Sequence, residues 1–136
     1  MHGGTQPDRR TISADDFFTG MFETALEDDE VITKVSFPVP KRAGYQKFAN
    51  PASRYAVVGV MVAETAGGVR VAVTGAAGSV FRVPEMETAL ASSFSPDALN
   101  GIAVDGTDFN EDLHASAEYR AHLVGVMAKR AVAAAG

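Results

Sequence analysis

The sequence predicts an α+β fold in which an antiparallel β-meander of three to five strands packs with several helices, the last of them long. Between residues 31 and 83, short apolar or alternating segments follow one another, with connections too short to contain crossover helices. After Pro84 the composition changes to helix-start signals and alanine-rich stretches with helical spacing. Strands first and helices afterwards is the order expected of an α+β domain.

The length and charge of the chain limit its domain count and its partners. The chain has 136 residues, 46% of them hydrophobic, which suffices for one core, so we predict a flexible segment over residues 1–10 and a single domain over 11–136. A formal charge of −5 with scattered basic residues disfavours binding to nucleic acid or an anionic membrane. No apolar run approaches the ~20 residues of a membrane span, and a signal peptide is not evident, so we expect a cytoplasmic protein.

The first predicted element covers residues 11–26. Ser13 and Asp16 form a Ser-x-x-Asp helix start, and the following large apolar residues gather on one side at helical spacing. Gly20 interrupts the pattern. The segment therefore predicts two short helical turns around a kink.

The strands of the meander follow. Val31, Thr33, Val35 and Phe37 alternate with more polar neighbours, which predicts a strand ended by Pro38. The sequence KRAG then turns the chain into the next strand, YQKFA.

The run from Tyr55 to Glu64 is β-branched and almost entirely apolar, so we expect a central strand covered on both faces. The sequence TAGG predicts a hairpin loop, after which Val69, Val71 and Val73 share one face of a strand. SVFRV is a fifth, shorter candidate.

Three helical segments complete the predicted fold. Pro84 stands at the first position of one helix, and residues 95–101 offer a serine cap, a proline and a closing glycine. The last helix, within residues 114–136, has an apolar stripe that should pack on the sheet or its neighbours. This stripe contains Tyr119, Leu123, Val126, Met127 and Ala131, and we expect Glu118, Arg120 and Lys129 on the opposite, polar side.

The residue types offer little for catalysis. The chain has no cysteine, and the spacing of His114 and His122 is not the one that brings two metal ligands together on a helix. No serine elbow is present, and the acidic residues show no sign of burial or of a cation partner. We therefore predict no catalytic residue and no metal site. The small-residue loop TGAAGS fits either a phosphate-binding loop or a plain turn between strands.

Lys47 is the one side chain with a functional interpretation. In a strand, Tyr45 and Lys47 point to one face and Gln46 and Phe48 to the other, so an aromatic ring and an ammonium share a face. Lys47 either guards a sheet edge against pairing or belongs to a platform for a planar, electron-rich ligand.

Five stretches in this order are similar to one known family: RRTISADDFFTG, LEDDEVITKVSFPVP, YQKFANPASRYAVVGVMVA, VRVAVTGAAGSVFRV and DLHASAEYRAHLVGVMAKRA. The sequence from about Arg10 to the end resembles the C-terminal domain of carbon monoxide dehydrogenase medium subunits. These are the FAD-binding flavoproteins of the xanthine dehydrogenase-type molybdenum hydroxylases. The resemblance implies the same α+β fold.

The resemblance also implies a cofactor and partners. By position, Ile32 matches an aliphatic residue that packs near the flavin in the family, and Lys47 matches a lysine that reaches it. FAD is implied for the complete subunit, and none for this chain alone, because upstream domains hold most of the FAD in the family and the chain looks like a fragment. The implied partners are a molybdenum-containing large subunit and an iron–sulfur small subunit. Arg54 stands where many members carry an acid.

Two other functions are compatible with the sequence. One is a module that docks subunits or dimerises without contacting a cofactor. The other is a stand-alone small-molecule-binding protein, which needs a sizeable pocket.

Overall fold

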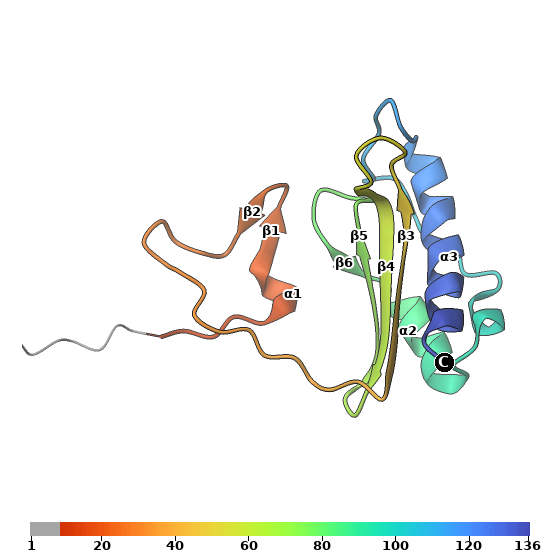
Figure 1. The fold of residues 1–136 in the computed structure, drawn as a ribbon, viewed down its shortest axis with the longest axis horizontal. Helices are drawn as coiled ribbons and strands as arrows, with labels where there is room; N and C mark the ends of the chain where they lie inside the picture. Colours follow the sequence, from red (N-terminus) through yellow and green to blue (C-terminus); the bar gives the residue numbers. More distant parts are fainter. Residues whose placement is uncertain (1–8) are drawn as a thin grey trace, which may run out of the picture.

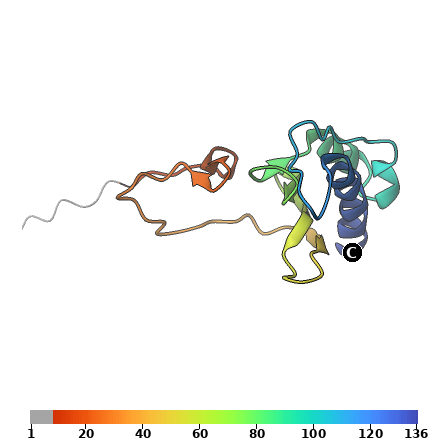
Figure 2. The same cartoon turned by 90° about the horizontal axis from the view of Figure 1, so that it is seen from above.

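The computed structural model describes residues 9–136, so most of the predicted flexible segment, residues 1–10, lies outside the described part. Figure 1 shows a twisted sheet with helices along one side and the N-terminal segment on the other. Seen from above in Figure 2, the N-terminal segment extends away from the sheet and its helices. Within this segment Arg10 forms an ion pair of 2.6 Å with Glu30.

The main sheet is the antiparallel meander predicted from the sequence. Its strands are β3 (Arg42–Ala49), β4 (Ala56–Thr65), β5 (Gly68–Thr74) and β6 (Phe81–Arg82), and they lie in the order β3-β4-β5-β6. Each strand pairs antiparallel with the next in the chain. The predicted hairpin loop TAGG between β4 and β5 is confirmed, with Thr65 opposite Gly68.

The core lies on one face of this sheet. Val58, Val60 and Val62 of β4 are fully buried there, together with the three valines of β5. The central position of β4 is confirmed, since β3 and β5 flank it. Cover on both faces was also predicted, and this is wrong for the second half of the strand, because Met61 on the other face is 40% exposed. The two longer described helices pack on one face only.

The helices begin where their sequence signals indicate. They are α2 (Pro84–Ser92), the 3-10 turn η1 (Pro96–Leu99) and α3 (Ala117–Ala134). Pro84 occupies the first turn of α2, and the Ser95 and Ser116 hydroxyls accept hydrogen bonds from backbone N–H groups of the turns that they cap. Helix α2 packs on β5, whereas α3 lies along β3 and β4.

The apolar stripe of α3 is only partly as predicted. Leu123, Met127 and Ala131 are buried against the sheet, whereas Tyr119 at the rim is half-exposed. The prediction that Arg120 lies on the polar side is wrong, because this arginine is 2% exposed.

The N-terminal segment contains one helical turn and a small hairpin. Helix α1 (Ala14–Phe17) is followed by β1 (Phe18–Gly20) and β2 (Glu23–Thr24). The predicted second helical turn after Gly20 is therefore wrong. Phe22 has a φ of 58°, a left-handed conformation that reverses the chain and that a right-handed helix does not contain.

The predicted strand over residues 31–38 is also wrong. All residues from 31 to 40 are exposed, and none belongs to a strand. The alternating pattern is present, yet a strand needs a partner edge, and no described segment offers one to these residues.

Candidate functional site

The two faces of β3 have opposite environments. On one face, an added Cβ at Gly44 would lie 2.1 Å from the carbonyl oxygen of Ala131, so only glycine lets α3 approach this closely. Phe48, on the same face, contacts the ring of Tyr119 at 6.2 Å between centroids. Tyr45 and Lys47 share the other face of the strand, as predicted, and this face points away from α2 and α3.

This face is named the open face and is defined by residues of three neighbouring strands: Tyr45 and Lys47 from β3, Gly59 and Met61 from β4, and Thr74 from β5. Lys47 lies opposite Gly59, and Tyr45 opposite Met61. A Cβ at Gly59 would come within 2.6 Å of the Tyr45 hydroxyl and 2.8 Å of the Thr74 hydroxyl. Tyr45 thus lies across Gly59, and the middle of the open face is flat.

The Lys47 ammonium is held by the turn that joins β3 and β4. Its Nζ donates a hydrogen bond of 2.8 Å to the carbonyl oxygen of Arg54. The buried Asn50 organises that turn, because its Oδ1 accepts from the backbone N–H groups of Ala52 and Ser53. Arg54 has a φ of 65°, the left-handed conformation needed to aim its carbonyl back at the lysine. The turn therefore holds a positive charge at the edge of the open face.

Ile32, the other predicted cofactor-contacting residue, lies elsewhere. It belongs to the extended segment between β2 and β3 and is 55% exposed. The described structure does not bring it into contact with Lys47.

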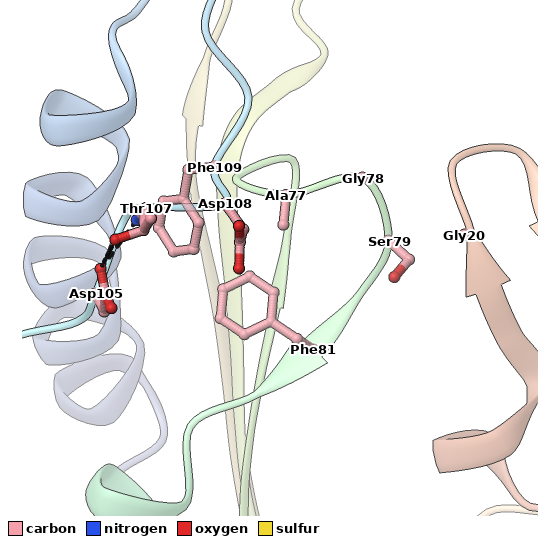
Figure 3. A pocket seen from close by; sticks show the side chains of 9 residues that line it. All are labelled: Gly20, Ala77, Gly78, Ser79, Phe81, Asp105, Thr107, Asp108 and Phe109. Atoms are coloured by element: carbon pink, nitrogen blue, oxygen red, sulfur yellow. Dashed lines mark hydrogen bonds between the residues drawn. The ribbon is translucent and has the colours of Figure 1, made fainter.

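A surface depression with a volume of about 400 Å³ lies beside the loop that contains TGAAGS. In Figure 3, Phe81 and Phe109 supply the aromatic part of its lining, the Asp108 side chain stands next to the Phe81 ring, and Asp105 lies beyond Thr107. Hydrogen bonds from the Thr107 hydroxyl and N–H lower the pKa of Asp105, so this carboxylate is ionised at neutral pH. Two carboxylates disfavour a phosphate there.

The loop itself has a structural explanation. Asn110 holds the loop through two of the loop's carbonyl oxygens. The side-chain amide of Asn110 donates a hydrogen bond to the carbonyl of Ala77, and the backbone N–H of Asn110 donates one to the carbonyl of Ala76. Gly75 has a φ of 81°, and a Cβ there would lie 2.5 Å from the carbonyl oxygen of Ala56. These observations favour the plain turn over a phosphate-binding loop.

Arg120 is the buried charge that sequence reasoning missed. Its guanidinium donates to the carbonyls of Val57 at 2.6 Å and Gly75 at 3.1 Å and to the Asp112 carboxylate at 2.8 Å. It thereby joins α3 to β4, to the turn after β5 and to the loop before α3. The signal was present in the sequence, because Arg120 stands three and seven positions before Leu123 and Met127 on the buried stripe.

Metal and membrane features can be stated for residues 9–136. Within this range no three histidine, cysteine, aspartate or glutamate side chains come together as a metal-binding group. None of the described helices is both long enough and apolar enough to cross a bilayer. His114 and His122 lie against the rings of Tyr55 and Tyr119, and His2 lies outside the described residues.

Comparison with known proteins gives consistent matches. The family model of the CO dehydrogenase flavoprotein C-terminal domain matches residues 43–135. The nicotine 6-hydroxylase medium subunit of Paenarthrobacter nicotinovorans is 40% identical over 94% of this chain and 49% of its own length. The carbon monoxide dehydrogenase medium chain of Hydrogenophaga pseudoflava is 30% identical over 93% of this chain and 48% of its own.

The fold has the same relatives. The solved structure of reconstituted CO dehydrogenase from Oligotropha carboxidovorans superposes with a TM-score of 0.76 and 26% identity, covering 93% of this chain and 48% of that one. The chain thus spans about half the length of the curated relatives that it matches.

Proposed function

The chain belongs to the CO dehydrogenase flavoprotein C-terminal domain family, and on this premise we propose that it is the C-terminal domain of the FAD-binding medium subunit of a molybdenum hydroxylase. In this proposal the open face covers the flavin, with Lys47 and Ile32 as the contacting residues. The partners are a molybdenum-containing large subunit and an iron–sulfur small subunit of a cytoplasmic complex. The chain itself contributes positioning and electrostatics, and bound FAD supplies the redox chemistry.

The observation that carries the proposal is the open face itself. A four-stranded sheet with helices on one side leaves Tyr45 and Met61 47% and 40% exposed on the other. An aromatic ring and a thioether around the flat position Gly59 suit a planar ring system. Lys47 adds a positive charge at the edge of this surface, which suits a ring that gains negative charge on reduction. The residues present therefore fit a flavin.

Ile32 fits the proposal through its exposure. The segment that carries it presents apolar side chains without cover among the described residues, which suits a residue that packs against a cofactor or another domain. Its contact with the flavin requires the segment to meet the cofactor in the complete subunit.

The test uses a chimera in which this chain follows the N-terminal half of the nicotine 6-hydroxylase medium subunit, so that FAD can bind. Lys47→Met keeps most of the stem and removes the charge. Removing one favourable charge interaction of about 1–2 kcal/mol should lower the two-electron flavin potential by roughly 20–40 mV. Lys129→Met, on the helix side of the sheet, is the matched control and should leave the potential unchanged.

The same measurement tests the alternative function, a docking module without cofactor contact. If Lys47→Met changes neither the potential nor the FAD affinity of a well-folded chimera, the open face does not contact the flavin. The chain would then be a docking module without cofactor contact.

A further inference from the structure

The Lys47 ammonium is oriented by a neutral partner. Its Nζ donates a hydrogen bond of 2.8 Å to the carbonyl oxygen of Arg54, and among residues 9–136 it belongs to no ion pair. A carboxylate partner would orient the ammonium and also offset its charge. The carbonyl orients the ammonium without offsetting its charge, and two of its three N–H donors remain for a ligand. The full positive charge is therefore available at the edge of the open face.

The position of the accepting carbonyl depends on the backbone of Arg54. This residue has a φ of 65°, a left-handed conformation that branched side chains rarely adopt. Its backbone N–H donates a hydrogen bond of 3.0 Å to the carbonyl oxygen of Asn50, which closes the turn over residues 50–54. The backbone of Arg54, and not its guanidinium, makes the contact with Lys47.

Asn50 holds this turn together from inside. Its side chain is buried, and its Oδ1 accepts hydrogen bonds of 2.9 Å and 3.2 Å from the N–H groups of Ala52 and Ser53. Its backbone N–H donates to the carbonyl oxygen of Tyr55 at 2.8 Å, and its own carbonyl accepts from Arg54. Ala52, Ser53 and Arg54 are exposed, so the hydrogen bonds of Asn50, rather than burial, fix the shape of the turn.

We propose that Asn50 is the positioning residue for Lys47. Through the turn it holds the ammonium at the edge of the open face, oriented and with its charge uncompensated. This inference rests on the proposed function, in which the ammonium meets the flavin. A lysine side chain loses rotamer entropy when it is fixed, and a turn that has already fixed it removes part of that cost from ligand binding. Asn50 acts through Lys47 and does not itself contact the ligand.

The first experiment uses the chain alone and measures the order parameter of the Lys47 ammonium by NMR relaxation of its nitrogen. Asn50→Ala leaves two N–H groups of the exposed turn to water and should release the ammonium, so that the order parameter falls below ~0.6. Asn100→Ala is the matched control, because it removes the acceptor of Lys129 on the helix side and should leave the order of Lys47 unchanged. Both variants should keep the far-ultraviolet circular dichroism of the parent.

The second experiment compares two substitutions of Arg54 in the FAD-loaded chimera. Arg54→Gly and Arg54→Val lose the same guanidinium, but glycine readily adopts a φ of 65° and valine does not. Arg54→Gly therefore keeps the carbonyl in place, whereas Arg54→Val moves it. The flavin potential of Arg54→Val should be the lower of the two, because only this variant loses the oriented ammonium.

The third experiment is a double-mutant cycle on the flavin potential of the same chimera. Asn50→Ala should lower the potential, as Lys47→Met does, and should have no further effect in the Lys47→Met background. A residue that only stabilised the fold would shift the potential equally in both backgrounds or in neither.

The outcomes separate this inference from the proposed function. An unchanged potential in Lys47→Met overturns the proposed function, and the flavin role of Asn50 with it. If Lys47→Met lowers the potential and Asn50→Ala does not, or if the Asn50→Ala shift persists in the Lys47→Met background, the role of Asn50 alone is overturned. An unaltered order parameter in Asn50→Ala, or equal potentials in the two Arg54 variants, also overturns it. Loss of ammonium order, together with no further shift in the Lys47→Met background, supports it.

Discussion

Replacing Arg120 by methionine should destabilise the fold more than the removal of any other charged side chain of α3. The arginine side chain is 3% exposed and holds the carbonyls of Val57 and Gly75 and the carboxylate of Asp112. Methionine fills much of the volume but donates no hydrogen bond, so two carbonyls at the centre of the fold lose a charged donor.

The magnitude follows from these contacts. Removing one partner of a buried ion pair costs roughly 3–5 kcal/mol, and the lower end applies because the side chain of Asp112 is 44% exposed and regains water. We therefore expect the free energy of unfolding to fall by about 3 kcal/mol. With a urea dependence of about 2 kcal/mol per molar, the unfolding midpoint should fall by ~1.5 M.

The assay is urea unfolding followed by circular dichroism, with Arg130→Met as the control. Arg130 is exposed on the same helix, and its replacement should change stability by less than ~0.5 kcal/mol. An Arg120→Met protein that unfolds at the same urea concentration as the parent would refute the assigned role of the buried guanidinium.

Three further predictions concern the chain alone. The purified chain should elute from gel filtration without a flavin absorbance band, and a band near one equivalent would contradict the proposal that the complete subunit is needed to hold FAD. Val58→Asp should prevent folding, because Val58 is fully buried on the central strand and an unpaired carboxylate would be buried there; soluble mutant that unfolds cooperatively would disprove this. The Arg10 guanidinium, helped by a backbone N–H, lowers the pKa of Glu30 from 4.5 to about 2. Because the folded pKa is the lower one, this carboxylate stabilises the fold above pH 4.5 and loses that effect as the pH falls towards about 2, so Glu30→Gln should flatten the acid unfolding profile in this range; identical profiles would exclude the effect.

The elements that could be predicted from the sequence are those whose signals are local. Period-two burial in β5, the proline at the start of α2 and the serine caps depend on residues next to one another, and all are present. The central position of β4 was predicted and is confirmed, although the continuous apolar run on which it rested indicates cover on both faces, and the second half of the strand lacks this cover.

The two wrong predictions concern features that depend on contacts between residues far apart in the sequence. Residues 31–38 carry the same alternation as β5, yet β5 has neighbours on both edges and this segment has none among the described residues. Arg120 was assigned to the surface by residue type, although the carbonyls of Val57 and Gly75 provide the partners that allow its burial.

The candidate site was predictable in part. The shared face of Tyr45 and Lys47 follows from strand periodicity, and the open face agrees with it. The hydrogen bond from Lys47 to Arg54 could not be predicted, because it depends on the left-handed conformation of Arg54 in the turn. The flavin contacts of Lys47 and Ile32 remain predictions.

The central claim is that the open face lies against the flavin, and the most direct test is a crystal structure of the FAD-loaded chimera. We expect the flavin ring over Tyr45 and Met61, with the Lys47 ammonium at hydrogen-bond distance, ~3 Å, from a ring heteroatom. A flavin bound on the helix side of the sheet, or separated from Lys47 by more than one intervening side chain, would contradict it.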